Sequence, residues 1–299
     1  MSSPTTTEPP GGVLLVDKDP GFTSHNAVAL CRRVLGTKKV GHCGTLDPMA
    51  TGMLIVVIGK ATKLQDKLMC EDKVYSATMK LGVETNSQDA DGEVVAVKPT
   101  AGISEEQIHA AFEHFHTEFD QVPPMYSAVK INGKKLSELA RKGVEVERKA
   151  RSVTIYALDL LDERSPEGDF LLRVRCSKGT YIRTLCHDIG QALGCGGCMA
   201  SLKRTEACGF SLEEAHSLDE VVAAPDPAAL LRPVDQLFRD RPAISVNAKG
   251  EEKLRHGNSL TASKLEEGEY RVYGPTGEFL LLGKAGQGKL TTIKSFFEV

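Results

Sequence analysis

The run Gly41-His42-Cys43-Gly44-Thr45-Leu46-Asp47-Pro48-Met49-Ala50-Thr51-Gly52 combines three glycines, a proline and several small residues. It stands directly before Met53 to Ile58, an apolar run typical of a buried strand. A loop of this composition can hold one side chain rigidly at the end of a sheet, and Asp47 is its only acid. An Asp-Pro pair also fits a simple turn cap, so the loop alone leaves both interpretations open.

A second run, Cys176-Ser177-Lys178-Gly179-Thr180-Tyr181-Ile182-Arg183-Thr184, reads as a strand that passes into a helix capped by Thr180. Backbone N–H groups at such a junction can receive an anion, assisted by Lys178 and Arg183. If Arg183 faces Asp47, a bidentate pair would keep that carboxylate ionised and aimed. The alternative is an ordinary surface arginine.

Metal and nucleotide motifs are weak. No Gly-Lys-Ser/Thr follows the glycines, which excludes a Walker loop, and His42 and Cys43 lack companions at zinc-ligand spacing. Cys195 and Cys198 form a single C-x-x-C pair, for which a zinc or redox site is a minor alternative to free thiols. Both cysteines are therefore expected to be free thiols.

Composition excludes several protein classes. The 299 residues are 41% hydrophobic and 26% charged, and the longest apolar run is far shorter than the roughly 20 residues of a membrane helix. Residues 1–10 lack the basic and apolar regions of a secretory signal, and eight cysteines are ordinary usage for a reducing compartment. We expect a cytoplasmic globular protein that does not associate with a membrane.

Charge is unevenly distributed. The net charge is −3, yet residues 128–151 carry eight bases against three acids, and residues 20–46 hold four bases and no acid. These stretches are either a track for phosphates or two solvated faces, and charge alone does not decide between them. The candidate phosphate-binding side chains in the first stretch are Lys130, Lys134, Lys135, Arg141, Lys142 and Arg148.

The element pattern favours an α+β protein with a mixed, largely antiparallel sheet flanked by helices, because strands and helices do not alternate regularly. Ser24 is the expected cap of a helix ending at Gly36, and Ser104 with Gln107 forms a capping box. Strands at 74–82 and 93–97 are expected to pair with each other through a loop containing Asp91-Gly92.

Three segments are predicted along the chain. Residues 1–11 read as a disordered tail and residues 12–240 as one large domain, which ends after the proline-marked stretch 225–229. Residues 241–299 contain short strand-like runs separated by glycine turns, typical of a small β-barrel or sandwich.

The two motif runs, the Asp17-Lys18 turn and Met125-Tyr126-Ser127-Ala128 together resemble, in order and spacing, the TruB family of tRNA pseudouridine synthases. The similarity covers roughly residues 12–210, and the C-terminal segment resembles a PUA-type RNA-binding domain. The resemblance implies a pseudouridine-synthase fold that isomerises uridine 55 in the T-loop of tRNA. It further implies a reaction that uses no metal and no cofactor. We also expect a monomer that binds the tRNA T-arm without an obligate protein partner.

Family position also implies residue roles. Asp47 is the expected catalytic carboxylate, attacking either C6 of the base or C1′ of the ribose, and Arg183 is its partner. Tyr75 packs on the target base and helps to remove the C5 proton. His42 assists extrusion of the base and fills the vacated place.

The remaining implied residues shape the site. Tyr181 and Leu202 line the uracil pocket, Lys18 supports the loop that carries Asp47, and the basic residues 128–151 fold over the T-loop.

Three alternatives stay open. The first is a guide-RNA-directed, dyskerin-like synthase subunit, and the second is a non-catalytic tRNA-binding or folding factor. The third, a carboxylate hydrolase, needs a second acid across the site, and neither motif run contains one.

Overall fold

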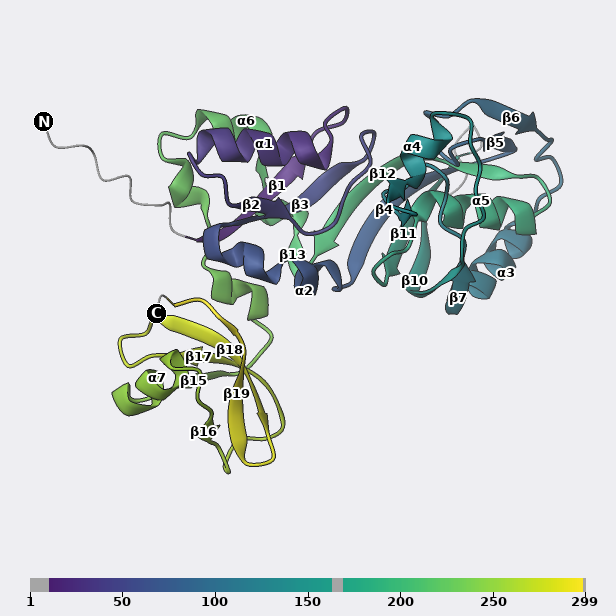
Figure 1. The fold of residues 1–299 in the computed structure, drawn as a ribbon. Coiled ribbons are helices and arrows are strands. Elements are labelled where there is room, and N and C mark those ends of the chain that lie inside the picture. Colours follow the sequence, from purple (N-terminus) through teal and green to yellow (C-terminus); the bar gives the residue numbers. More distant parts are fainter. Residues whose placement is uncertain (1–10, 163–168, 298–299) are drawn as a thin grey trace, which may run out of the picture.

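The structure is a computed structural model that describes residues 11–162 and 169–297 (Figure 1). The predicted disordered tail therefore lies, apart from residue 11, outside the described residues. No helix in the described part of the chain is long and apolar enough to cross a membrane.

A ten-stranded mixed sheet forms the body of the molecule, in the order β14-β1-β3-β12-β4-β11-β10-β7, with β13 beside β12 and β2 beside β3. The β1–β14 and β3–β12 pairs are parallel and the other pairs of this sheet are antiparallel. This confirms the predicted α+β class. The strands are β1 (Gly12–Lys18), β2 (Val40–His42), β3 (Thr51–Ile58), β4 (Lys73–Leu81), β7 (Glu118–Gln121), β10 (Arg151–Asp162), β11 (Asp169–Cys176), β12 (Gly197–Ala207), β13 (Phe210–Ser211) and β14 (His216–Ser217).

The helices are divided between the two halves of the sheet. The helix α1 packs against α6 beside β1, whereas α5 packs against α3, β4 and β12 (Figure 1). The α-helices are α1 (Ser24–Val34), α2 (Gln65–Met69), α3 (Glu105–Phe115), α4 (Leu136–Ala140), α5 (Ile182–Ala192) and α6 (Leu218–Ala223). Short 3-10 helices are η1 (Gly59–Leu64), η2 (Leu212–Glu214), η3 (Pro227–Leu230) and η4 (Val234–Phe238).

Both faces of β3 are buried, which explains its continuous apolar run. Leu54, Val56 and Ile58 join the core on one face of the strand. Met53, Ile55 and Val57 join the core on the other face. Each such side chain contributes about 1.5–3 kcal/mol when it is fully buried. The strand is therefore a rigid base for the loop that precedes it.

Two predicted helix caps are wrong, for a shared reason. Thr23, not Ser24, caps α1 by accepting from the amide of Asn26, and the buried Ser24 hydroxyl instead accepts from the amide of Leu46 at 2.8 Å. Similarly, Tyr181 occupies the N-cap of α5, because the Thr180 hydroxyl donates to a backbone carbonyl. Both hydroxyls are held by long-range or turn contacts. The capping box at Ser104 is confirmed.

The predicted pairing of the strands near residues 74–82 and 93–97 is also wrong. The strand β6 (Val94–Val97) pairs with β5 (Val83–Thr85), whereas β4 lies inside the large sheet between β12 and β11. The strand β4 is buried along most of its length and so needs a neighbour on each side. The Asp91-Gly92 turn lies in the loop that joins β5 to β6.

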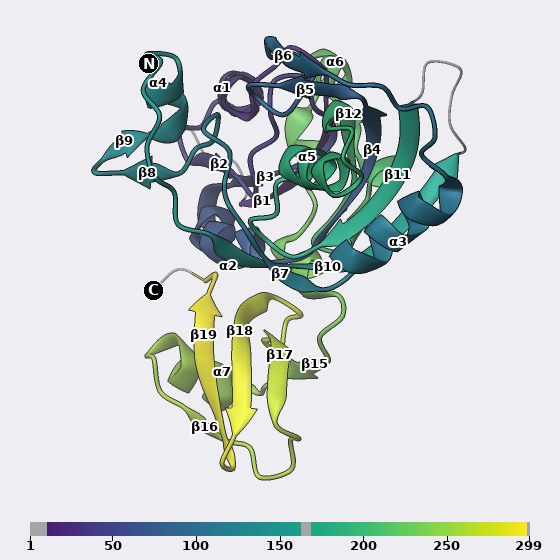
Figure 2. The same cartoon turned by 90° about the vertical axis from the view of Figure 1, so that its right-hand side faces the viewer.

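The C-terminal segment forms a separate five-stranded sheet in the order β15-β17-β18-β19-β16, with α7 (Ala248–Arg255) packed beside it (Figure 2). Its strands are β15 (Ala243–Ser245), β16 (Leu260–Thr261), β17 (Gly268–Tyr273), β18 (Phe279–Gly286) and β19 (Lys289–Ser295). The short strand-like runs predicted for this segment, at 270–273, 279–282 and 290–293, are confirmed as parts of β17, β18 and β19. Phe279 stacks on Phe296 and lies close to Phe238 of η4, so this sheet packs on the main body through an aromatic contact.

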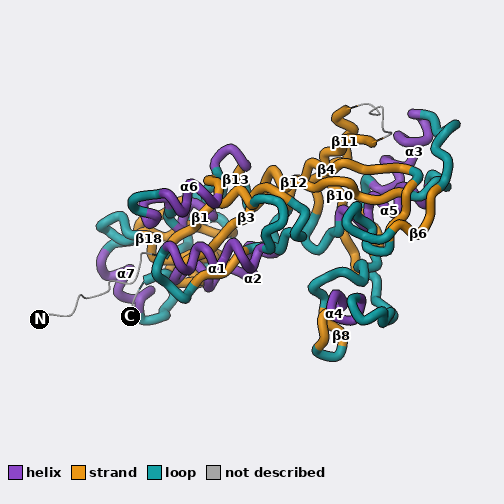
Figure 3. Tube along the Cα trace, turned by 90° about the horizontal axis from the view of Figure 1, so that it is seen from above, coloured by secondary structure: helices purple, strands orange, loops and turns teal. Residues whose placement is uncertain are grey.

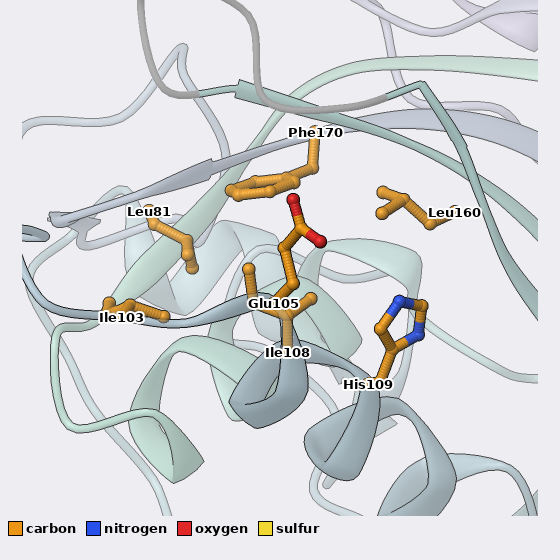
Figure 4. A pocket seen from close by; sticks show the side chains of 7 residues that line it. All are labelled: Leu81, Ile103, Glu105, Ile108, His109, Leu160 and Phe170. Atoms are coloured by element: carbon orange, nitrogen blue, oxygen red, sulfur yellow. The ribbon is translucent and has the colours of Figure 1, made fainter.

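A small cavity of about 180 Å³ lies between α3 and the strands β4, β10 and β11. Figure 4 shows aliphatic and aromatic side chains around it, with Glu105 and His109 projecting from α3. Residues of the two motif runs do not line it.

Candidate active site

A cavity of about 950 Å³ opens where three loops meet. They are the Asp47 loop (residues 43–50, between β2 and β3), the 86–93 loop between β5 and β6, and the turn from β11 into α5. Six of the seven predicted catalytic and substrate-binding residues line this cavity: His42, Asp47, Tyr75, Tyr181, Arg183 and Leu202. The structure therefore brings together residues that are far apart in the sequence.

Arg183 and Asp47 form an ion pair, as the sequence suggested, but not in the expected geometry. One nitrogen of the guanidinium, Nη2, lies 3.0 Å from Oδ1 and 2.9 Å from Oδ2 of Asp47. The arginine side chain is 5% exposed and the aspartate 34% exposed, so the acid faces the cavity while its partner is buried. The pair is not a two-nitrogen fork, because Nη1 binds a different acid.

That second acid is Asp89, which the sequence analysis did not select. Its Oδ2 lies 3.2 Å from Nη1 of Arg183, and its Oδ1 accepts from the Ser87 hydroxyl at 2.6 Å. The 86–93 loop is held to β12 by paired backbone hydrogen bonds, including Ala90 N to Met199 O at 2.9 Å. The acidic Asp89-Ala90-Asp91 sequence was visible, but its approach to Arg183 depends on how the loop folds back.

Burial raises the pKa of Asp47 above its usual value. The positive charges of Arg183 and, to a smaller extent, Lys18 oppose this effect, while the Asp89 charge adds to it. Desolvation outweighs the guanidinium in setting the direction of this shift, while the ion pair with Arg183 limits the rise of the Asp47 pKa. A carboxylate of this kind is more basic and more nucleophilic than an exposed one.

Lys18 supports the Asp47 loop from behind and does not line the cavity. Its side chain is fully buried, and Nζ donates to the carbonyls of Asp19 at 2.8 Å, Phe22 at 2.7 Å and Pro48 at 3.2 Å. Burial lowers the pKa of Lys18 to about 8, against the opposing charges of Asp19 and Asp47. The bond to Pro48 ties the end of β1 to the residue after Asp47.

Gly52 allows β3 and β12 to approach at the base of the same loop. Its φ is +96°, and a Cβ at this position would lie 2.3 Å from the carbonyl oxygen of Arg204. The two residues are register partners in the parallel β3–β12 pair. Any side chain here would therefore separate the strands that position Asp47.

Tyr75 and Leu202 come from the neighbouring strands β4 and β12 and form part of the cavity wall. Tyr75 is 9% exposed, and burial raises the pKa of its phenol. Tyr181 is fixed by both polar groups of the Gln121 side chain, at 2.8 and 3.1 Å, and the Arg183 guanidinium lies 5.9 Å from its ring centroid. These contacts leave an aromatic and aliphatic slot beside Asp47.

His42 ends β2 at the rim of the cavity. Burial lowers the pKa of its imidazole, with a smaller contribution from the charge of Arg204. Its Nδ1 is buried and has no hydrogen-bond partner among the described residues. The ring is thus neutral at pH 7.

The basic insertion (residues 128–151) stands away from the body as a short hairpin and α4 (Figure 3). The strands β8 (Lys130–Ile131) and β9 (Lys134–Lys135) are joined by Asn132 and Gly133, both with positive φ, as a type I′ turn requires. Of its six predicted RNA-binding side chains, Lys135 and Arg141 line the cavity, while Lys130, Lys134 and Lys142 are exposed outside it.

Arg148, the sixth, is engaged within the protein. Its Nη1 donates to the carbonyl of Pro123 at 3.3 Å, and Nη2 pairs with Glu145 at 3.0 Å. Its side chain is half-buried, so its main contacts hold the end of the insertion against the body.

Cys195 and Cys198 are both buried free thiols. Across residues 11–162 and 169–297, no three His, Cys, Asp or Glu side chains are grouped as metal ligands.

Two family models match adjacent parts of the chain. The model described as TruB family pseudouridylate synthase, N-terminal domain, matches residues 32–182 and contains both Asp47 and Tyr75. A model described as tRNA pseudouridylate synthase B C-terminal domain matches residues 183–239. The chain belongs to the TruB family of pseudouridylate synthases. This confirms the predicted family and the predicted enzyme class, an isomerase.

Curated relatives within the TruB family match most of the chain. A protein of Ralstonia pickettii named tRNA pseudouridine synthase B is 46% identical over 269 residues, covering 88% of this chain and 84% of its own. A protein of the same name from Aromatoleum aromaticum is 46% identical over 284 residues, covering 94% and 91%.

Solved structures share the TruB fold of this chain. A chain in an H/ACA ribonucleoprotein bound to a substrate RNA containing 2′-deoxyuridine has a TM-score of 0.71 at 25% identity, covering 96% of this chain and 85% of its own. A chain in a Cbf5–Nop10–Gar1 complex gives 0.70 at 27% identity, covering 96% and 84%. The pseudouridine-synthase fold is confirmed.

Proposed function

We propose that this protein converts uridine 55 in the T-loop of tRNA to pseudouridine, with Asp47 as the catalytic carboxylate. The observation that carries the proposal is the position of Asp47. This carboxylate is partly exposed, faces a cavity of about 950 Å³ and forms an ion pair with the buried Arg183. The name shared by the curated relatives, tRNA pseudouridine synthase B, supports tRNA as the substrate.

The reaction moves the base without adding or removing atoms overall. Asp47 attacks C6 of the base or C1′ of the ribose, and the C1′–N1 bond breaks with its electron pair leaving on the base. The base turns, C5 bonds to C1′ as Asp47 is released, the C5 proton is lost and N1 gains a proton. Both routes require Asp47 to be ionised, which its pairing with Arg183 favours.

The other cavity residues have proposed roles in holding the base. Tyr75 packs on it and assists removal of the C5 proton, while Tyr181 and Leu202 enclose it. A base within a folded T-loop must be extruded to enter such a cavity. His42, neutral and at the rim, takes the place that the base leaves.

The basic insertion provides the proposed contact with the T-arm. Its exposed lysines and Arg141 lie beside the cavity and suit contacts with phosphates flanking the extruded base. We also propose that residues 12–240 form the catalytic domain and residues 241–299 a PUA-like RNA-binding domain. The protein is proposed to act as a cytoplasmic monomer without an obligate protein partner.

The guide-RNA-directed alternative is less well supported. The chains from structures whose titles name an H/ACA ribonucleoprotein or Cbf5 are 25–27% identical to this chain, whereas curated relatives named tRNA pseudouridine synthase B reach 46%. The hydrolase alternative requires an acid facing Asp47 across the cavity. Asp89 instead shares the same guanidinium and is held by Ser87, and the other two acids that line the cavity, Asp91 and Glu93, are exposed on the 86–93 loop.

The decisive experiment measures release of tritium from unmodified tRNA labelled at C5 of uridine, with the modified position mapped afterwards. Wild-type protein is expected to convert one T-loop uridine, in whole tRNA and in a T-arm hairpin. Asp47→Asn is expected to lose activity and retain tRNA binding. Equal activity of both proteins, or modification outside the T-loop, would contradict the proposal. Equal RNA-folding activity of the wild type and Asp47→Asn, with no pseudouridine formed by the wild type, would favour a tRNA-folding factor.

A further inference from the structure

Arg204 is a fully buried arginine in the wall of the active-site cavity, and it has no role in the reaction proposed for Asp47 and its neighbours. It lies on β12 with its side chain 1% exposed, and it is the register partner of Tyr75 on the adjacent antiparallel strand β4. Side chains of directly opposed residues point to the same face of a sheet and contact each other. Arg204 and Tyr75 both line the cavity, so the guanidinium stands directly beside the ring that is proposed to hold the base.

The charge of Arg204 is not balanced by an acid. Its Nε donates to the carbonyl of Met53 at 2.6 Å and its Nη2 to the carbonyl of Gly44 at 3.2 Å. Among the residues that the structure describes, no carboxylate lies within ion-pair distance of it. A buried charge without an ion-pair partner costs folding free energy. A residue that carries this cost is expected where its charge serves the function of the protein.

Two further buried cations lie near Arg204: Lys73, which lines the cavity, and Lys18, which lies outside the cavity lining and holds the Asp47 loop. Lys18 and Lys73 are buried at 0% and 6% exposure and bind backbone carbonyls. Neither lysine has an ion pair with a described residue, whereas the acids Asp47 and Asp89 are both satisfied by Arg183. Buried positive charge in and around the cavity therefore exceeds buried negative charge, and the other two acids that line the cavity, Asp91 and Glu93, are exposed.

The proposed reaction creates the complementary charge. When the C1′–N1 bond breaks, its electron pair stays on uracil, and the detached base carries a negative charge. That charge disappears when C5 donates its electron pair to C1′ and the new carbon–carbon bond forms. A preorganised cation beside the base stabilises this anion and the transition states that lead to it, without reorganising during the reaction.

We infer that Arg204 is the buried cation that stabilises the negative charge on the detached uracil, from its position beside Tyr75. This inference rests on the proposed pseudouridine synthase function. It separates two basic residues by role: Arg183 positions the attacking carboxylate, and Arg204 lowers the energy of the leaving base. The alternative is that Arg204 only anchors the Asp47 loop through its bonds to Gly44 and Met53.

Charge and hydrogen-bond geometry are separated by comparing Arg204→Lys with Arg204→Met in the full-length protein. Lysine retains the charge and loses the planar fork, whereas methionine loses both. Arg173→Met is the matched control, because Arg173 lies on the exposed face of β11, on the other side of β4 from β12. The measurements are the single-turnover rate of tritium release from labelled tRNA, the dissociation constant for tRNA and the melting temperature.

The inference predicts that Arg204→Met slows the single-turnover step by about 100-fold with little change in tRNA affinity. Arg204→Lys is expected to recover at least about tenfold of that loss, and the control to match wild type. The acidic limb of the rate-versus-pH profile, which reports Asp47, should stay in place in Arg204→Met. If methionine at this position prevents folding, Arg204→Gln serves as the neutral variant and is expected to show the same loss.

Two results would overturn the inference alone: a neutral variant within about threefold of the wild-type rate, or a lysine variant as slow as the neutral one. The second result would establish the anchoring role instead. Absence of tritium release by the wild-type protein would instead refute the proposed function, and the inference with it.

Discussion

The carboxylate of Asp89 lies 3.2 Å from Nη1 of Arg183, whose other terminal nitrogen holds Asp47. Asp89 is itself 7% exposed and accepts from the Ser87 hydroxyl, so one end of this chain of contacts is fixed in the 86–93 loop. The orientation of the nucleophile thus depends on a loop that is distant from it in sequence. Arg183 is a positioning group whose own position needs a second acid.

Substitution of Asp89 by Asn is expected to slow pseudouridine formation by about 10- to 100-fold, because Arg183 loses a charged anchor and Asp47 loses alignment. The Asp89 charge also raises the pKa of Asp47, so its removal should lower that pKa and move the acidic limb of the rate to lower pH. Single-turnover rates between pH 4 and 8 test both effects. Asp159→Asn, an exposed acid on β10, is the control. An acidic limb that moves to higher pH would contradict this interpretation.

The ionisation of Lys18 is expected to set the alkaline limb of the rate-versus-pH profile. Its pKa is lowered by burial from an ordinary value of 10.5 to about 8, so activity should decline above about pH 8 as the positive charge behind the Asp47 loop is lost. Folding stability should change in the opposite sense. Because the unfolded chain binds more protons than the folded one between pH 8 and 10.5, this group makes the free energy of unfolding rise with pH there.

Rates and urea unfolding over pH 7–10 check the two parts separately. Lys18→Arg keeps its charge throughout this range and is expected to move the alkaline limb upward. An unchanged limb in that variant would assign the decline to another group.

Gly52→Ala is expected to destabilise the protein by about 2 to 3 kcal/mol and to abolish activity, because the new Cβ would overlap the backbone of Arg204 and force β3 and β12 apart. Gly277→Ala is the matched control, since its φ is also positive at +82° but open space surrounds it. That substitution should cost about 1 kcal/mol and leave the rate unaltered. Urea unfolding and tritium release measure both. Similar losses in the two variants would show that backbone conformation alone matters.

The basic side chains of the insertion are expected to have two different roles: some contact RNA, and one makes contacts within the protein. Lys135→Ala and Arg141→Ala should each weaken tRNA binding and reduce the slope of log K against log salt by about 0.7 to 0.9, because each removes one phosphate contact. Arg148→Ala should leave the slope unchanged, since its guanidinium is engaged with Pro123 and Glu145. Binding titrations from 50 to 300 mM salt decide the matter. A reduced slope in Arg148→Ala would place that side chain on the RNA.

The α+β class was predicted from the order of the expected strands and helices, and Tyr75 and Leu202 were predicted from family position alone. The glycine-rich run around Asp47 and the run containing Arg183 carried most of the resemblance to the family, and they contain the other four predicted residues of the cavity. Their information is local: apolar periodicity, turn glycines and the short spacing within each motif. The capping box at Ser104 was predicted for the same reason. The backbone conformation of a cap or a turn depends mainly on a few adjacent residues, so a short stretch of sequence is enough to predict it.

Tertiary structure alone decided what each charged side chain faces. Asp89 joins the site because the 86–93 loop folds back onto β12, and Arg204 stands beside Tyr75 because β12 pairs with β4. It also decided the sign of the Asp47 pKa shift, since desolvation depends on everything packed around the carboxylate. Contacts between distant segments and the burial they produce are properties of the whole packed chain, so no stretch of sequence contains them.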